Sequence, residues 1–208
     1  MAIKLKENLY LSPTAKAVYQ VMMCMTEHEH GTLIKNLLKH PETPRFTEAF
    51  LLDWLSTDDI DGAVKKVQEL NQLGLVKGIT EKRQIPDLPS DVALTECVKN
   101  LSDEGVMLAN DQGFYLVNEG FEQEDADEIA AMAAELFTFH KKRVSPLVEK
   151  GLIESEVWSM LNYQGRLSLS FWPIKTASES FTLVIKGAVK FNQDSLVDLA
   201  RLLMNKYQ

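Results

Sequence analysis

Two prolines near the middle of the chain separate segments with different hydrophobic periodicity. Pro86 and Pro89 lie in the polar run Glu81–Asp91, where they block both a continuous helix and a central strand. Before this run apolar residues recur every three to four positions, which is typical of helices, whereas several later segments alternate apolar and polar residues, which is typical of strands. We therefore expect two domains, at residues 1–85 and 90–208.

The first domain is predicted to be mostly helical. Ser12 is expected to cap a first helix that begins at Pro13 and runs to about residue 27. A second, short helix is expected to stop before Pro41, and Thr47 is expected to cap a third. The apolar spacing then predicts a fourth helix, opened by Thr57 or Asp58, with one buried stripe: Ile60, Val64, Val67 and Leu70.

Gly74 is expected to end that fourth helix in a left-handed conformation, before a short strand at Leu75–Ile79. This order, ending in the sequence ELNQLGLV, resembles the winged helix-turn-helix family over about residues 12–80. Such domains commonly place their last helix in the DNA major groove. The resemblance implies three nucleic-acid contacts: Lys65, Lys66 and Lys77.

The second domain is predicted to be α+β. In chain order we expect a helix around 94–101, a hairpin within 105–120 turning at Asp111-Gln112-Gly113, a long helix over 124–140, strands over 157–163, 167–172 and 181–186, and a final helix around 196–204. A five-stranded antiparallel sheet flanked by helices buries these apolar faces most economically, and the last three strands are expected to be half-buried.

The hairpin and the alanine-rich helix after it resemble the roadblock family, which comprises dynein light chains and bacterial regulators of small Ras-like GTPases. The resemblance covers about residues 90–208 and rests on these residues: Gly105, Val106, Leu108, Asp111, Gly113 and Ala130 to Ala134. This chain departs from the family pattern at Gln112 in the turn and in its aromatic later strands, which carry Trp158, Tyr163, Phe171 and Trp172.

The roadblock resemblance implies a homodimer in which the long helix and the third strand meet their symmetry mates. The matching helix residues are Ile129, Met132, Leu136 and Phe139. On the strand they are either Trp158 and Met160, or Val157, Leu161 and Tyr163, because the sequence does not fix which strand face turns outward. The alternative is that all of these residues belong to the core of one monomer.

Catalytic and metal-binding motifs are missing from the sequence: it holds no glycine-rich phosphate loop, no nucleophile elbow and no zinc-protease helix. We therefore expect no enzyme activity and no cofactor. Cys24 and His28 are spaced like metal ligands, with His30 and His40 further on, but we interpret this segment as a frayed helix end with solvated histidines. We also expect His140 to lie at the surface or at an interface. Cys24 and Cys97 are expected to be buried, inert thiols.

The net charge of −8 weighs against nucleic acid and anionic membranes as partners. Residues 1–85 hold 11 basic and 11 acidic residues, so the acidic excess lies in the second domain. Three carboxylates also begin the fourth helix, where DNA phosphates would approach: Asp58, Asp59 and Asp61.

No apolar run is long enough to span a membrane and no signal peptide begins the chain, so we expect a cytoplasmic protein. Our leading hypothesis is a non-enzymatic, dimeric regulator or scaffold that binds a protein partner, for which the resemblance suggests a small Ras-like GTPase. The alternative is a DNA-binding transcriptional regulator.

Overall fold

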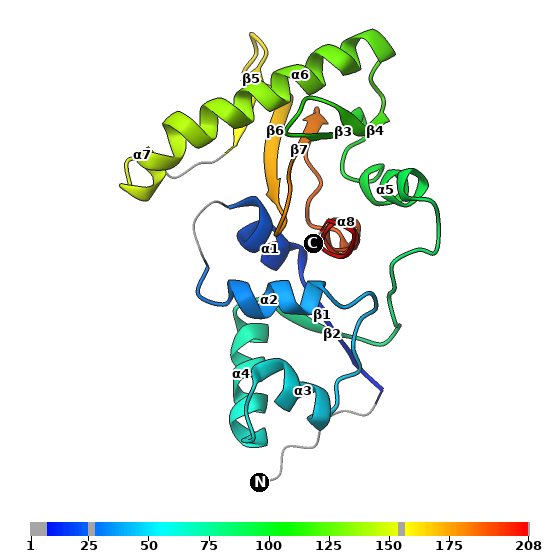
Figure 1. Cartoon of the computed structure of the whole chain (residues 1–208), viewed down its shortest axis with the longest axis vertical. Helices are drawn as coiled ribbons and strands as arrows, with labels where there is room; N and C mark the ends of the chain where they lie inside the picture. Colours follow the sequence, from blue (N-terminus) through cyan, green and yellow to red (C-terminus); the bar gives the residue numbers. More distant parts are fainter. Residues whose placement is uncertain (1–7, 25–27, 154–156, 208) are drawn as a thin grey trace.

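A five-stranded antiparallel sheet organises the second half of the chain, which confirms the predicted α+β class (Figure 1). The computed structural model describes residues 8–24, 28–153 and 157–207. The sheet has the spatial order β4-β3-β7-β6-β5, with strands β3 (Gly105–Asn110), β4 (Tyr115–Glu119), β5 (Trp158–Leu161), β6 (Leu167–Lys175) and β7 (Ser180–Lys186). All five strands lie where the sequence predicts them.

Helices cover both faces of this sheet. Helix α6 (Gln123–Phe139) packs on one face, whereas α5 (Ser90–Val98) and α8 (Asp194–Lys206) pack on the other. Strand β7 is therefore buried on both sides: Val184 contacts the α6 layer, while Leu183 faces α5 and α8. The expectation of a half-buried strand was wrong for β7, because it lies at the centre of the sheet between two helical layers.

Small residues let α6 lie close to the sheet and to the β3–β4 turn. Its inward face is made of three fully buried alanines: Ala126, Ala130 and Ala133. Gly113, in the turn, has φ +87°, and a Cβ there would lie 3.3 Å from the Cα of Ala131. The helical path also continues past the predicted end at His140, through a π-helical turn (His140–Val144) into α7 (Ser145–Glu149).

The first half consists of a two-stranded sheet and a group of short helices. Its elements are β1 (Tyr10–Pro13), α1 (Ala15–Val18), a π-helical turn (Tyr19–Met23), α2 (Gly31–Leu38), α3 (Glu48–Leu55), α4 (Ile60–Gln72) and β2 (Val76–Ile79). Strand β1 pairs antiparallel with β2. Thr47 caps α3 by accepting a hydrogen bond from the Phe50 amide, and Gly74 has the left-handed φ of +71° expected after α4.

The predicted start of the first helix was wrong. Ser12 and Pro13 lie in β1, because the end of β1 pairs with β2, which the local sequence does not reveal. Thr14 caps α1 instead: its hydroxyl accepts a hydrogen bond from the Ala17 amide at 3.2 Å and donates one to the Gly74 carbonyl at 2.6 Å. The helical path also ends at Met23, short of residue 27.

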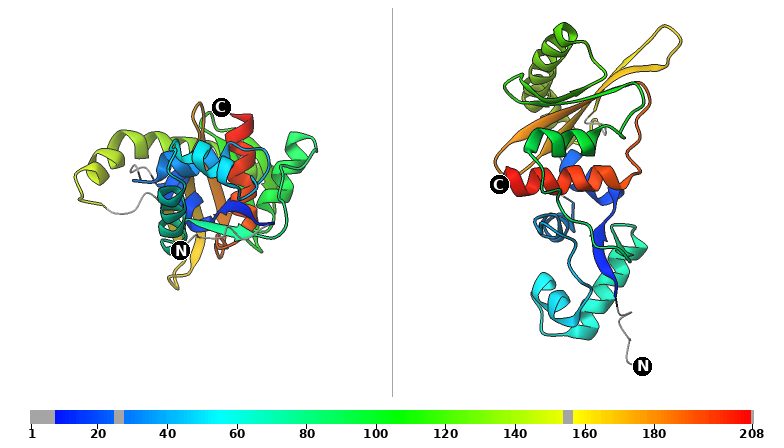
Figure 2. Two further views of the ribbon diagram at one scale, coloured as in Figure 1. Left: turned by 90° about the horizontal axis from the view of Figure 1, so that it is seen from below. Right: turned by 90° about the vertical axis from the view of Figure 1, so that its right-hand side faces the viewer.

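Helix α8 joins the two halves of the chain (Figure 2). Its apolar residues belong to one continuous hydrophobic core that includes residues of both halves. Two of its polar residues contact the first half: Asp194 pairs with Lys77 at 2.5 Å, and Asn205 donates to the Leu38 carbonyl at 3.1 Å. The division at residues 85–90 stays a prediction.

Candidate functional site

Strand β5 forms an apolar, uncharged edge of the sheet, four residues long and with a register irregularity between Met160 and Leu161. Among the described strands it pairs only with β6. Its sequence, Trp-Ser-Met-Leu, holds no charged residue and no proline, two of the features that protect an edge. Met160 and Leu161 are exposed to 43% and 63%. Apolar side chains and unpaired backbone groups of this kind are suited to pairing with another chain.

The register of β5 shows which of its residues face α6. Trp158 lies opposite Phe171, and Met160 lies opposite Leu169. Because Phe171 is buried in the cluster beneath α6, Trp158 and Met160 point to that face of the sheet. Of the two open alternatives, Trp158 and Met160 are therefore the residues that lie on the same side as the long helix.

Of the four predicted residues of α6, Phe139 contacts this strand, and Leu136 lines a small cavity together with Trp158. Ile129, Met132 and Leu136 are half-buried and pack against the cluster beneath the helix. Phe139 is 50% exposed and packs edge-to-face on Trp158, with ring centroids 5.6 Å apart. The structure thus brings helix and strand residues together on one apolar surface, which we call the α6–β5 surface: Ile129, Met132, Leu136, Phe139, Trp158 and Met160.

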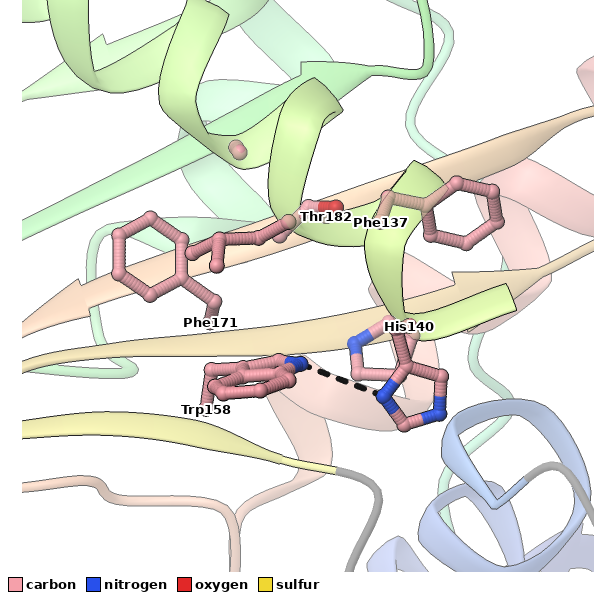
Figure 3. Close-up of a pocket in the computed structure, with 8 residues that line it drawn as sticks. Phe137, His140, Trp158, Phe171 and Thr182 are labelled. Atoms are coloured by element: carbon pink, nitrogen blue, oxygen red, sulfur yellow. Dashed lines mark hydrogen bonds between the residues drawn. The ribbon is translucent and has the colours of Figure 1, made fainter. Parts of the chain in front are cut away.

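A buried histidine anchors Trp158 beneath this surface (Figure 3). The Nε1 of Trp158 donates a hydrogen bond to Nδ1 of His140 at 3.3 Å. His140 is 3% exposed, and burial, with a smaller effect from Lys175, lowers its pKa. A neutral ring is required, because a protonated imidazole has no acceptor. Of the two positions expected for His140, the surface or an interface, the surface one was wrong, since the ring is buried on the sheet-facing side of the helix.

The cavity beside His140 is too small for a substrate. Its volume is about 10 Å³, roughly the room that one water needs. Its lining is largely apolar: Ala133, Leu136, Phe137, His140, Trp158, Phe171, Pro173 and Thr182. The pair therefore fixes α6 against β5, and we assign it a positioning role.

Comparisons with known proteins give only partial structural likenesses. No family model matches the chain, and no curated protein matches it. A roadblock/LC7 domain from Streptomyces avermitilis is 16% identical, with 58% of this chain and 93% of that domain covered and a TM-score of 0.36. Myxococcus xanthus MglB is 14% identical, with 57% and 95% covered and a TM-score of 0.38.

The three lysines predicted to contact nucleic acid differ in whether they already pair with a carboxylate of this chain. Lys65 is exposed on α4. Lys66 pairs with Glu69 at 3.0 Å, and Lys77 lies on β2, where it pairs with Asp194. Two of the three lysines thus pair with carboxylates of the same chain.

The histidines and cysteines provide no metal centre in the described part of the chain, which contains no group of three or more potential ligands. His30 is buried, not solvated as expected, and its Nε2 lies 3.6 Å from Glu69. Cys24 is half-buried, contrary to expectation, because the helical path ends before it. Cys97 is buried, and its burial, assisted by Asp198, raises its pKa to about 12, which keeps the thiol protonated. No helix among the described residues meets the length and hydropathy needed to cross a membrane.

Sequence reasoning missed the polar face of α8. Asp194, Asp198, Arg201 and Asn205 recur at helical spacing and turn toward the first half. Asp198 pairs with Arg83 at 2.8 Å, so residues 115 positions apart are joined. The sequence does show this face, as a stripe of charged residues on an otherwise apolar helix. The residues that the stripe contacts lie far away in the sequence, so the spacing within the helix could not identify them.

Proposed function

We propose that the protein is a non-enzymatic, cytoplasmic regulator or scaffold that forms a homodimer through the α6–β5 surface. The observation that carries this proposal is the apolar, uncharged edge of β5 beside the exposed ring of Phe139. Apolar surface and open backbone groups lie together there, so pairing with a second copy would satisfy both. The resemblance of residues 90–208 to the roadblock family points to the same helix and strand.

The dimer would present a composite surface to a protein partner, for which a small Ras-like GTPase is our proposed class. This class comes from the sequence resemblance. Binding assays with purified small Ras-like GTPases, each loaded with GDP or a non-hydrolysable GTP analogue, test it directly. Lack of binding in both nucleotide states across such a panel would reject the GTPase while leaving the dimer to its own test.

We propose a supporting role in protein contact for the winged-helix-like first half. The alternative, DNA binding through α4, is disfavoured because Lys66 and Lys77 already pair with Glu69 and Asp194. A mobility shift with mixed duplex DNA at low and moderate salt distinguishes the two roles. We expect no shift; tight, salt-dependent binding would establish the alternative.

The dimer is tested by placing a charge on the proposed surface. Phe139→Glu would bury an unpaired carboxylate twice in each symmetric interface, at a cost of about 3 kcal/mol or more, which weakens dimerisation at least about 100-fold. The matched control is Phe114→Glu, since Phe114 is also exposed (67%) but lies in the β3–β4 turn, near the edge of the sheet opposite to β5.

Sedimentation equilibrium of both variants gives the answer, with circular dichroism to establish that each is folded. A monomeric Phe139→Glu variant beside a dimeric Phe114→Glu variant supports the proposed surface. Equal dimerisation of both variants would reject it.

A further inference from the structure

The sheet has a second edge, at strand β4, on the side opposite to β5. Among the described strands β4 pairs only with β3, and the register of the pair shifts between Leu108 and Ala109, near the start of β4. The backbone groups on the outer side of β4 are therefore open to pairing with another chain.

An exposed aromatic ring stands at the start of this edge. Phe114 directly precedes β4 and is 67% exposed. Its backbone N–H donates to Oδ1 of Asn110 at 2.9 Å, so the turn that carries the ring is held in place. The face of an exposed aromatic ring attracts the cationic group of an arginine or a lysine.

The β3–β4 turn lies along the first part of α6. A Cβ on Gly113 would lie 3.3 Å from Ala131, and the Tyr115 hydroxyl accepts a hydrogen bond from the Gln123 side chain. Asp127 lies one helical turn from both Gln123 and Ala131, so it belongs to the stripe of α6 that follows the turn. Its exposed carboxylate therefore lies on the same side of the molecule as the start of β4.

The charge of the chain is concentrated in this region. Residues 100–140, which include the β3–β4 hairpin and α6, hold ten carboxylates and no lysine or arginine, which exceeds the net charge of −8 of the whole chain. Within the described part of the chain only Asp103 among the ten forms an ion pair, with Lys190. The others, including Asp111 in the turn and Asp127, leave a negative potential around β4.

This charge decides which occupant fits the β4 edge. A second copy of the chain would bring the same carboxylates together across a two-fold axis, so like charges would repel. A segment rich in arginine or lysine would meet opposite charge and could place a cation on the ring of Phe114. The β5 edge, which holds no charged residue, lacks this discrimination.

We infer that β4 and the Phe114 ring form a docking surface for an extended, arginine- or lysine-rich segment of another protein, which adds to the sheet as a further strand. Asp111 and Asp127 supply the opposite charge. The inference goes beyond the proposed homodimer and does not depend on it, because β4 and β5 are opposite edges of the sheet.

A synthetic peptide of alternating arginine and valine is the probe, because alternate residues of a strand point to the same face. Fluorescence anisotropy of the labelled peptide, titrated with the full chain at low salt, is expected to show saturable binding. The same peptide with glutamate in place of arginine is expected not to bind. A peptide with proline in place of valine keeps the charges but lacks half of the backbone N–H groups, so it is expected to bind at least about tenfold more weakly.

Two variants of the chain test the residues of this surface. Phe114→Ala removes the ring and is expected to weaken binding of the arginine–valine peptide about threefold. The double variant D111N/D127N removes two charges at nearly constant shape and is expected to weaken binding about fivefold. Circular dichroism establishes that both variants are folded, as expected for exposed positions.

Matched controls make the same changes elsewhere. Tyr163→Ala removes a ring that is 95% exposed between β5 and β6, and E48Q/D53N removes two exposed carboxylates of α3. Both controls are expected to bind the peptide like the unmodified chain.

Each possible failure has a distinct meaning. Absence of saturable binding would overturn the docking surface. Equal binding of the proline peptide would overturn strand addition, because it would show attraction by charge alone. Equal effects of the variants and their controls would overturn the assignment to β4 and Phe114. A monomeric chain in sedimentation equilibrium would reject the homodimer and leave this inference standing.

Discussion

Replacement of Arg201 by methionine is expected to stabilise the protein, although it removes a charged residue from the contact between the two halves. Arg201 is 1% exposed, and no described residue accepts a hydrogen bond from its Nε, Nη1 or Nη2. Its nearest carboxylate oxygen is Oδ1 of Asp198, 3.8 Å from Nη1. Burial lowers the pKa of Arg201 and raises that of Asp198, so for both groups burial outweighs the opposite charges nearby.

The magnitude follows from comparing attraction with desolvation. Two unit charges about 4 Å apart attract by about 4 kcal/mol at an effective dielectric constant of about 20. Burying a guanidinium costs several kcal/mol, and its unpaired N–H groups add about 1–3 kcal/mol each at buried sites. The guanidinium is therefore a net cost, whereas methionine keeps most of the side-chain volume. We expect Arg201→Met to raise the free energy of unfolding by about 1–3 kcal/mol.

Urea unfolding at pH 7, followed by tryptophan fluorescence, measures this change as a shift in midpoint at constant slope. Arg201→Ala is the matched comparison, because it also removes the charge but leaves a cavity, and it is expected to cost about 2–4 kcal/mol relative to the methionine variant. A loss of about 2 kcal/mol or more in Arg201→Met would refute the reasoning, because it would mean that the buried charge is well compensated.

Two further predictions concern the hairpin and the buried histidine. Gly120→Ala is expected to lower the free energy of unfolding by at least about 2 kcal/mol, since the φ of Gly120 is +82° and a Cβ would lie 2.7 Å from the Glu104 carbonyl oxygen. The control is Gly165→Ala, at a residue with φ +74° and nothing within 4 Å of the added Cβ. This control should lower the free energy of unfolding by only about 1 kcal/mol in the same urea assay. Because the folded-state pKa of His140 is below its ordinary value of 6.5, the unfolded chain binds the extra proton first, so stability is expected to fall as pH drops below about 6.5. His140→Leu should remove that part of the pH dependence, and an unchanged pH profile would contradict the buried, neutral state.

Local pattern was sufficient for the sheet and for most helices of this chain. The alternation at residues 167–172 and 181–186, and the Asp111-Gln112-Gly113 turn, predicted strands that are present. Local pattern failed where partners distant in sequence decide the outcome. Ser12 and Pro13 would suit a helix start, but pairing with β2 draws them into a strand, and Thr14 takes the capping role.

The candidate site was also predicted only in part, because one of its two elements depends on partners distant in sequence. Helical spacing identified the stripe from Ile129 to Phe139, but only the strand register placed Trp158 and Met160 on the same side. His140 continues the helical spacing of the buried alanines Ala126, Ala130 and Ala133, so its place on the sheet-facing side was available from the sequence and was overlooked.

The mass of the unmodified chain in solution, measured by light scattering over a series of concentrations, tests the homodimer most directly. The proposed α6–β5 pairing predicts a particle of twice 23.5 kDa that dissociates only on dilution. A mass of 23.5 kDa at every concentration would contradict it.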